Sequence, residues 1–211
     1  MRILAVDTAL GACSCAVLED TNVLAHRFTV MERGHAEALA PMVEDAMRES
    51  GIAFAALDRL AVTTGPGTFT GQRIGLAFMR GMRIALKRPL IGITTLEAMA
   101  HQAMAETGLP RAASLHDAKR DEVYVETIPG NGPSLMLFDD AVRSLVGPIA
   151  LAGTAAPRVA EILSDATLST VRQPDALWVA RLALTRETSI EAPKPLYLRP
   201  PDAKLPAPRV A

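Results

Sequence analysis

The sequence predicts an α/β protein in which a sheet containing parallel strands is covered by helices. Short apolar stretches typical of buried strands alternate with segments of helical periodicity, and this order builds such sheets. The composition agrees, since 49% of the 211 residues are hydrophobic and 21% are charged. A chain of this length forms one large domain or two small ones, each with a real core.

The chain begins with three predicted strands and a helix. The strands are expected at residues 3–6, 13–19 and 23–30. In the helix that follows, apolar residues recur at helical spacing, and Gly51 is expected to end it. Pro41 lies inside this helix and should kink it or shift its start, because proline lacks the amide hydrogen that a helix uses.

Two more strands then alternate with two more helices. The strands are expected at residues 60–62 and 90–93, with a long helix between them. Thr94 and Glu97 form a capping box, which predicts the start of a third helix that runs through His101. A sheet with parallel strands follows from this alternation.

The second half of the chain is less regular, and no repeat of fixed period is evident. Polar and turn-forming residues at 106–111 suggest a boundary. Strands are expected at residues 112–116, 122–128, 135–138 and 149–151. A helix should follow Gly153, and Asp175 should cap a last helix that runs through Leu184. Residues 193–201 are rich in proline and should lie extended against the body of the protein.

A glycine-rich turn at residues 65–71 is the most distinctive motif. An apolar strand leads into Gly65, Pro66 and Gly67, and Thr68 stands before the long helix. Backbone amides at such a helix start attract anions, and glycine lets the backbone approach a ligand closely. The motif is not a P-loop, because no Gly-Lys-Ser/Thr closes the spacing. It predicts either a phosphate cradle or a tight structural turn, and the sequence does not separate the two.

The long helix after this turn has more apolar surface than one sheet can cover. A helix that lies on its own sheet needs an apolar stripe of only about 100°, and this one is roughly twice as wide. Its polar residues share one arc, in which Leu76 stands between Arg73 and Arg80. The helix is therefore either enclosed within its own domain or in contact with another protein. Met42 and Met47 would suit the same contact surface.

Charge and cysteine content exclude several classes of function. The net charge is −1 and no basic patch stands out, so a protein that grips nucleic acid unaided is disfavoured. Cys13 and Cys15 point to the same face of a strand and are expected to be buried thiols, since no second pair completes a zinc site. The apolar run at the N-terminus is too short for a secretory signal, so we expect a cytosolic protein without membrane contact.

Four segments together resemble the TsaB family, also called YeaZ. They are residues 3–18, the glycine-rich run 65–76, residues 117–124 and the terminal segment 195–199. The resemblance covers nearly the whole chain in order. It implies a two-lobed fold of the actin, sugar-kinase and Hsp70 type with a reduced second lobe. We expect an N-terminal lobe at residues 1–105 and a reduced C-terminal lobe with an extended proline-rich tail at residues 106–211.

The resemblance also implies a function in tRNA modification. TsaB-like proteins are needed to place threonylcarbamoyl on the adenosine just 3′ of the anticodon, while the paralogue TsaD performs the transfer and the ATPase TsaE assists. We therefore expect a non-catalytic scaffold that forms a heterodimer with a TsaD-like subunit, recruits a TsaE-like ATPase, self-associates weakly when alone and meets tRNA only within the complex. The expected contact residues lie on the first two helices: Leu39, Met42, Phe69, Arg73, Leu76 and Arg80. Replacing Leu76 with arginine should then abolish the complex and leave the fold intact.

The catalytic features of the paralogue are incomplete here. TsaD has a His-x-x-x-His metal motif, whereas the matching helix of this chain has only His101, and one imidazole does not hold a metal. A glycine-rich nucleotide clamp is reduced to residues 151–156, with one glycine left. We therefore expect no catalytic residue, metal or cofactor.

A vestigial nucleotide site is the remaining candidate. It would consist of Asp7, Gly65, Gly67 and Thr68. Asp7 stands where the superfamily places a carboxylate near the nucleotide metal, although capping of the following turn is the favoured role. The pair Lys119 and Arg120 reads as a solvated turn, with contact to tRNA phosphate as the alternative.

Two other classes of function compete with the scaffold. One is a stand-alone enzyme, either a kinase-like ATPase or a glycoprotease-like metallopeptidase, and steady turnover by the isolated chain would favour it. The other is a direct RNA-binding module, which tight and salt-sensitive tRNA binding by the isolated chain would favour.

Overall fold

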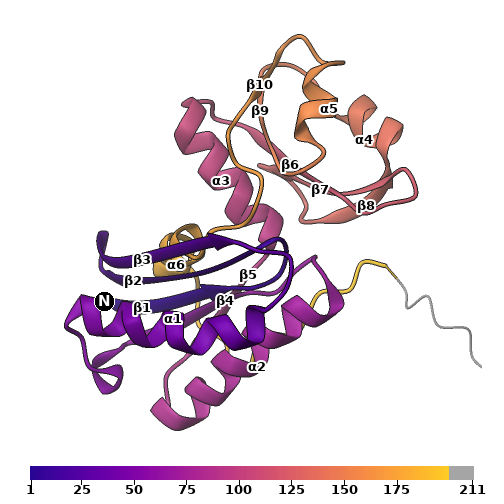
Figure 1. Cartoon of the computed structure of the whole chain (residues 1–211). Helices are drawn as coiled ribbons and strands as arrows, with labels where there is room; N and C mark the ends of the chain where they lie inside the picture. Colours follow the sequence, from indigo (N-terminus) through magenta and orange to yellow (C-terminus); the bar gives the residue numbers. More distant parts are fainter. Residues whose placement is uncertain (200–211) are drawn as a thin grey trace, which may run out of the picture.

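The computed structural model describes residues 1–199, so Pro200 and Pro201 of the predicted tail lie outside the described residues. The described residues form two five-stranded mixed sheets, each in a lobe of its own (Figure 1). The two-lobed α/β fold is therefore confirmed. No helix in this part of the chain is long and apolar enough to cross a bilayer.

All five strands predicted in the first lobe are present. They are β1 (Arg2–Asp7), β2 (Ala12–Glu19), β3 (Asn22–Val30), β4 (Arg59–Thr63) and β5 (Leu90–Ile93). Their order across the sheet is β3-β2-β1-β4-β5. The first three pair in antiparallel fashion, whereas β4 and β5 run parallel to β1. The central strands are buried on both faces, which explains why they read as continuous apolar runs.

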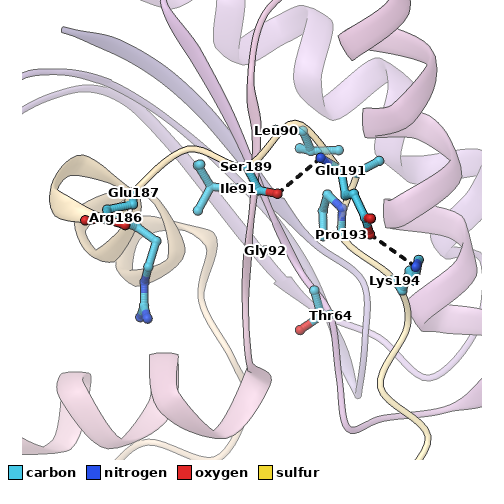
Figure 2. Close-up of a pocket in the computed structure, with 11 residues that line it drawn as sticks. Thr64, Leu90, Ile91, Gly92, Arg186, Glu187, Ser189, Glu191, Pro193 and Lys194 are labelled. Atoms are coloured by element: carbon cyan, nitrogen blue, oxygen red, sulfur yellow. Dashed lines mark hydrogen bonds and ion pairs between the residues drawn. The ribbon is translucent and has the colours of Figure 1, made fainter.

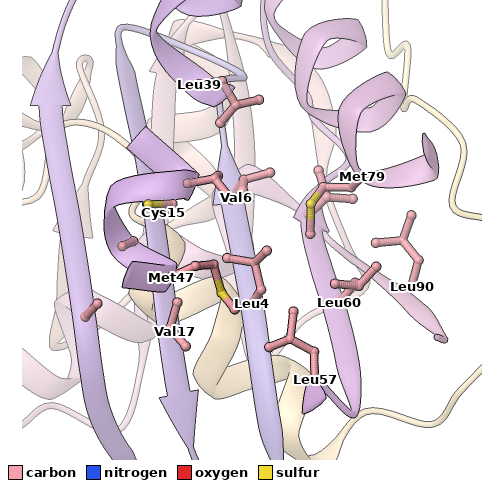
Figure 3. Close-up of a cluster of buried hydrophobic side chains, with 14 of the residues drawn as sticks. Leu4, Val6, Cys15, Val17, Leu39, Met47, Leu57, Leu60, Met79 and Leu90 are labelled. Carbon is pink, nitrogen blue, oxygen red and sulfur yellow. The ribbon is translucent and has the colours of Figure 1, made fainter. Parts of the chain in front are cut away.

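Helices cover both faces of this sheet. One face carries α1 (His35–Ser50) and α2 (Phe69–Leu86), whose apolar side chains join Leu4, Val6 and Leu60 in one core (Figure 3). The other face carries α6 (Ala176–Thr185), which packs on Ile3 and Ala5. A short 3-10 turn, η1 (Phe54–Ala56), precedes β4.

The predicted helix caps are correct, but one helix end is not. Gly51 ends α1 in the left-handed conformation, and the Thr94 hydroxyl accepts from the amide of Glu97 at the start of α3 (Thr95–Thr107). Pro41 lies inside α1 without shifting its start, which is six residues earlier. Helix α3 continues beyond His101 to Thr107, because its later turns pack on the second sheet through Ala103.

The second lobe repeats the topology of the first with shorter helices. Its elements are β6 (Ala112–Asp117), β7 (Glu122–Ile128), β8 (Ser134–Leu137), α4 (Phe138–Ser144), β9 (Ile149–Ala152), α5 (Ala156–Ala160) and β10 (Ala166–Leu168). The strand order is β8-β7-β6-β9-β10, which matches β3-β2-β1-β4-β5 position by position. The 7 residues of α4 and the 5 of α5 stand where the first lobe has the 16 of α1 and the 18 of α2. The second lobe is therefore a reduced copy of the first.

Two elements of this lobe were missed from the sequence, and one boundary was wrong. Phe138 begins α4 rather than ending a strand, since its side chain is buried in the second core. Neither α4 nor β10 was predicted, because both are too short to show periodicity.

The helix that ends each half of the chain packs against the other half's sheet. Helix α3 packs on β6, β7 and β9, and α6 packs on β1, β2 and β4 (Figure 1). The predicted lobe boundary at residues 105 and 106 falls inside α3. After α6, residues 186–199 contain no helix or strand and return along α2, as expected for the extended tail.

Candidate functional site

The glycine-rich turn packs against the turn between β1 and β2. The amide of Thr68 donates to the Ala9 carbonyl oxygen at 2.9 Å, and a Cβ on Gly67 would collide with the same oxygen. Thr8 links to α2 by two bonds, since its hydroxyl donates to the Gly71 carbonyl at 2.7 Å and accepts from the Gly75 amide at 3.0 Å. A Cβ on Gly71 would likewise collide with the Thr8 carbonyl oxygen. The close approach of the two backbone segments therefore explains by itself why glycine stands at positions 67 and 71.

Asp7 is a buried turn cap in the same place. Its Oδ1 atom accepts from the Ala9 amide at 3.1 Å and from the Thr63 hydroxyl at 2.5 Å. The Oδ2 atom is buried and has no hydrogen-bond partner among the described residues. Burial raises the pKa of this carboxyl to about 7. The structure thus gathers Asp7, Gly65, Gly67 and Thr68 at the carboxyl ends of β1 and β4, and the role of these residues toward a nucleotide stays a prediction.

The arginines of α2 bind the chain's own C-terminal segment. Arg83 and Arg80 each donate to a carbonyl oxygen at 2.6 Å, on Ile190 and Pro193 respectively. Arg73 donates to the Tyr197 hydroxyl at 2.8 Å. Its guanidinium also stacks on the Phe69 ring, 3.5 Å from the ring centre, and the two aromatic rings stack on each other. The polar arc of this helix is therefore occupied by residues 186–199.

Two of the predicted partner-contact residues are buried in the lobe's own core. Leu39 and Leu76 are 1% and 2% exposed and belong to the cluster between the sheet and the two helices. Figure 3 shows Leu39 pointing toward the strands. The prediction that these two residues contact a partner is wrong, because both side chains are enclosed in the core of their own lobe. The arginines beside Leu76, Arg73 and Arg80, bind the C-terminal segment, whereas Leu76 faces the sheet. Replacing Leu76 with arginine would disturb the fold itself.

The other four predicted contact residues lie nearer the surface. Met42 is half buried over Cys13, with their sulfur atoms 3.9 Å apart, and Arg80 is half buried against the C-terminal segment. Arg73 is exposed, and Phe69 is 59% exposed. Both cysteines are free and buried, as expected.

One face of α2 leaves apolar residues in solvent. We define the α2 face by its exposed apolar and small residues, which are Phe69, Ala77, Gly81, Ile84 and Ala85. Ile84 is 75% exposed, and Ile190 of the C-terminal segment, next to Arg83, is 94% exposed. Small residues at 77, 81 and 85 lie one turn apart, so a partner helix could approach the backbone closely. Part of the apolar surplus seen in the sequence therefore remains uncovered.

The residues matched to catalytic features of the paralogue are His101 and Gly153. His101 stands on α3 with Glu97 and Ala105 one turn away on either side, and burial lowers its pKa. Within residues 1–199, no three His, Cys, Asp or Glu side chains are grouped so as to hold a metal ion. Gly153, the remaining glycine of the clamp segment, is required by packing, since a Cβ there would collide with the Leu115 carbonyl.

Comparison with known sequences points to one family. Residues 22–170 match the family model described as "TsaD: tRNA N6-adenosine threonylcarbamoyltransferase". The Escherichia coli K12 protein "tRNA threonylcarbamoyladenosine biosynthesis protein TsaB" is 42% identical over 124 residues, which are 59% of this chain and 53% of that protein. The match thus spans about half the length of that relative. Mycobacterium tuberculosis H37Rv "Uncharacterized protein Rv3421c" is 35% identical over 208 residues, 96% of this chain and 93% of that protein.

Solved structures extend the likeness to the whole fold. A Pseudomonas aeruginosa protein described as similar to peptidase YEAZ superposes with a TM-score of 0.79 at 30% identity, covering 94% of this chain and 99% of that one. Component A of (R)-2-hydroxyglutaryl-CoA dehydratase from Acidaminococcus fermentans has a TM-score of 0.53 at 10% identity, over 86% of this chain and 97% of that one. The second likeness concerns the fold alone.

Proposed function

Because the chain belongs to the TsaB/YeaZ family, we propose that it acts in the biosynthesis of threonylcarbamoyladenosine in tRNA as a non-catalytic partner subunit. In this proposal it forms a heterodimer with a TsaD-like catalytic subunit in the cytoplasm, and the pair recruits a TsaE-like ATPase. In the absence of the catalytic subunit, weak self-association would use the same surface.

The α2 face is the observation that carries this proposal. Apolar side chains gathered on one exposed helix face mark interaction sites in many proteins, and Ile84 and Phe69 are both more than half exposed. The small residues between them let a second helix approach closely enough for its side chains to surround Ile84. A partner with an apolar helix would remove this surface from water, which is the main driving force for stable association.

The charge of the chain supports a shared rather than an independent contact with tRNA. Its net charge is −1, and proteins that bind nucleic acid alone carry a basic surface that neutralises phosphates. A partner that supplies most of the positive surface would account for this balance. The residue types around His101 also support a non-catalytic role, since the positions one helical turn before and after it hold Glu97 and Ala105 and not a second histidine.

The direct test is formation of the modified nucleoside in a reconstituted reaction. Purified TsaD-like and TsaE-like subunits, a threonylcarbamoyl donor, ATP and tRNA are combined with this chain, and threonylcarbamoyladenosine is measured by mass spectrometry. We expect Ile84→Glu to lower the product strongly, because a carboxylate would be desolvated in the interface. Ile162→Glu is the matched control, since Ile162 is 56% exposed in the second lobe. Full product formation without this chain would contradict the proposal.

A further inference from the structure

The C-terminal strap, defined as residues 186–199, joins the two lobes over a long path. It begins where Arg59 donates to the carbonyl oxygens at the end of α6, including that of Arg186 at 2.9 Å, and where Arg186 pairs with Glu97. It then passes the outer edge of β5, leaving a cavity of about 350 Å³ between them (Figure 2). The strap therefore starts firmly attached to the first lobe.

The middle of the strap is fixed to α2 and to the glycine-rich turn. Besides the three arginine contacts described above, the Leu196 amide donates to the Thr64 carbonyl oxygen at 2.8 Å. Thr64 immediately precedes Gly65, so this bond ties the strap to the turn that starts α2. Tyr197 stacks on Phe69 and receives the bond from Arg73. Tyr197 is 45% exposed and thus extends the α2 face by one aromatic ring.

Two residues further on, the strap holds a turn of the second lobe. The Arg199 guanidinium donates to the Ala118 carbonyl oxygen at 2.6 Å and pairs with the Glu122 carboxylate. The Arg199 side chain is 21% exposed and that of Glu122 is 30% exposed, so water screens this pair only in part.

The turn that Arg199 holds has an unfavourable backbone conformation. Lys119, Arg120 and Asp121 are consecutive, and all three have positive φ angles, of 64°, 57° and 56°. Residues other than glycine avoid this region because their Cβ crowds the following carbonyl group. Contacts to the turn offset this cost, and the Arg199 bond to the Ala118 carbonyl is a short, charge-assisted one. The Phe138 amide, which donates to the Asp121 carbonyl at 2.7 Å, is another such contact.

We propose that the strap couples the α2 face to the turn at residues 118–122, so that docking of the partner subunit on Phe69 and Tyr197 stabilises that turn in the second lobe. The inference rests on the proposed function for the identity of the occupant, a protein subunit with an apolar helix. Coupling requires only that the contacts of Tyr197 and those of Arg199 form together, and one residue separates the two side chains along the strap. A partner that favours the attached strap then also favours the ordered turn.

The coupling is testable in the free chain by hydrogen exchange of two groups of amides. One group reports on the turn, through the Ala118 amide, which donates to Glu122 at 2.9 Å, and the Glu122 amide. The other reports on the strap, through the Leu196 amide. We expect Tyr197→Ala to raise exchange of the turn amides about tenfold, and Arg199→Ala to raise exchange of the Leu196 amide by a similar factor.

Controls separate the coupling from general loosening and from the function. Ser164→Ala removes an exposed side-chain hydrogen bond in the same lobe and should change neither group, while Arg199→Lys keeps the charge but loses the planar guanidinium and should give part of the effect. If Tyr197→Ala leaves exchange of the turn amides unchanged and Arg199→Ala leaves exchange of the Leu196 amide unchanged, the coupling is refuted. If coupling is seen in the free chain but adding the TsaD-like subunit gives no complex, the coupling holds and the proposed function fails. If a complex forms and the turn amides keep their free-chain exchange rates, the coupling to docking is refuted.

Discussion

Replacing Asp7 with asparagine should leave the stability of the protein in acid unchanged. It should stabilise the protein increasingly as the pH rises from about 4, with the full effect above pH 7. Asp7 is fully buried, and burial raises the pKa of its carboxyl from 3.8 to about 7. Between these values the folded protein keeps a proton that the unfolded chain has lost, so the free energy of unfolding falls as the pH rises. About three pH units at roughly 1.4 kcal/mol each give a loss of about 4 kcal/mol, which levels off above pH 7.

Urea unfolding at pH values from 4 to 8 measures this difference. Asparagine keeps an oxygen for the Ala9 amide and the Thr63 hydroxyl but has no charge to bury, so the gap between variant and wild type should widen with pH. Glu126, whose pKa burial also raises to about 7, weakens both proteins in the same range and cancels in the difference. Asp165→Asn, at an exposed position, is the control. If the difference in the free energy of unfolding stayed constant from pH 4 to pH 8, the argument that burial raises the pKa of Asp7 in the folded protein would be refuted.

Two further pairs of substitutions test the packing of the first lobe, each read by thermal or chemical unfolding of the isolated chain. Leu76→Ala should cost about 2–5 kcal/mol because it opens a cavity in the core, whereas Ile84→Ala should change stability by less than about 0.5 kcal/mol; equal effects would contradict the orientation of α2. Gly67→Ala should destabilise the protein, because its Cβ would meet the Ala9 carbonyl. Gly81→Ala should stabilise it by about 0.5–1 kcal/mol, since open space surrounds that position in a helix, and the reverse order would be inconsistent with the close approach at the turn.

Local signals in the sequence predicted most of the first lobe. Its strands are buried on both faces and so read as apolar runs, and its helices end at recognisable caps such as Gly51 and Thr94. The cap at Asp175 was recognised in the same way, since its side chain accepts from the Leu177 amide. Such features depend on neighbours within a few residues, and this is why single-sequence reasoning finds them.

The errors came from contacts between residues far apart in the sequence. Arg80 and Arg83 of α2 formed a polar arc without an evident partner, because their partners are main-chain carbonyls of the strap, more than 100 residues away, which carry no side-chain signature. Leu76 consequently appeared to be an exposed apolar residue among charges, although it faces the sheet. The end of α3 was missed for a related reason. The helix continues to Thr107 because Ala103 packs on the second sheet, and this contact is not visible in the local sequence pattern.

The candidate site was predictable only in part. The glycine-rich turn and Asp7 lie together because both follow neighbouring parallel strands, and their role toward a nucleotide stays a prediction. What the sequence left open was whether the glycines serve a ligand or the backbone, and the close contacts of Gly67 and Gly71 with Thr8 and Ala9 favour the backbone.

The most direct test of the central claim is the mass of the complex between this chain and a TsaD-like subunit, measured by light scattering on a sizing column. We expect a species whose mass is that of the partner plus the 22.4 kDa of this chain. Ile84→Glu should remove this species, and Ile162→Glu should retain it. Two separate monomer peaks for the wild-type chain, or a complex that survives Ile84→Glu unchanged, would contradict docking through the α2 face.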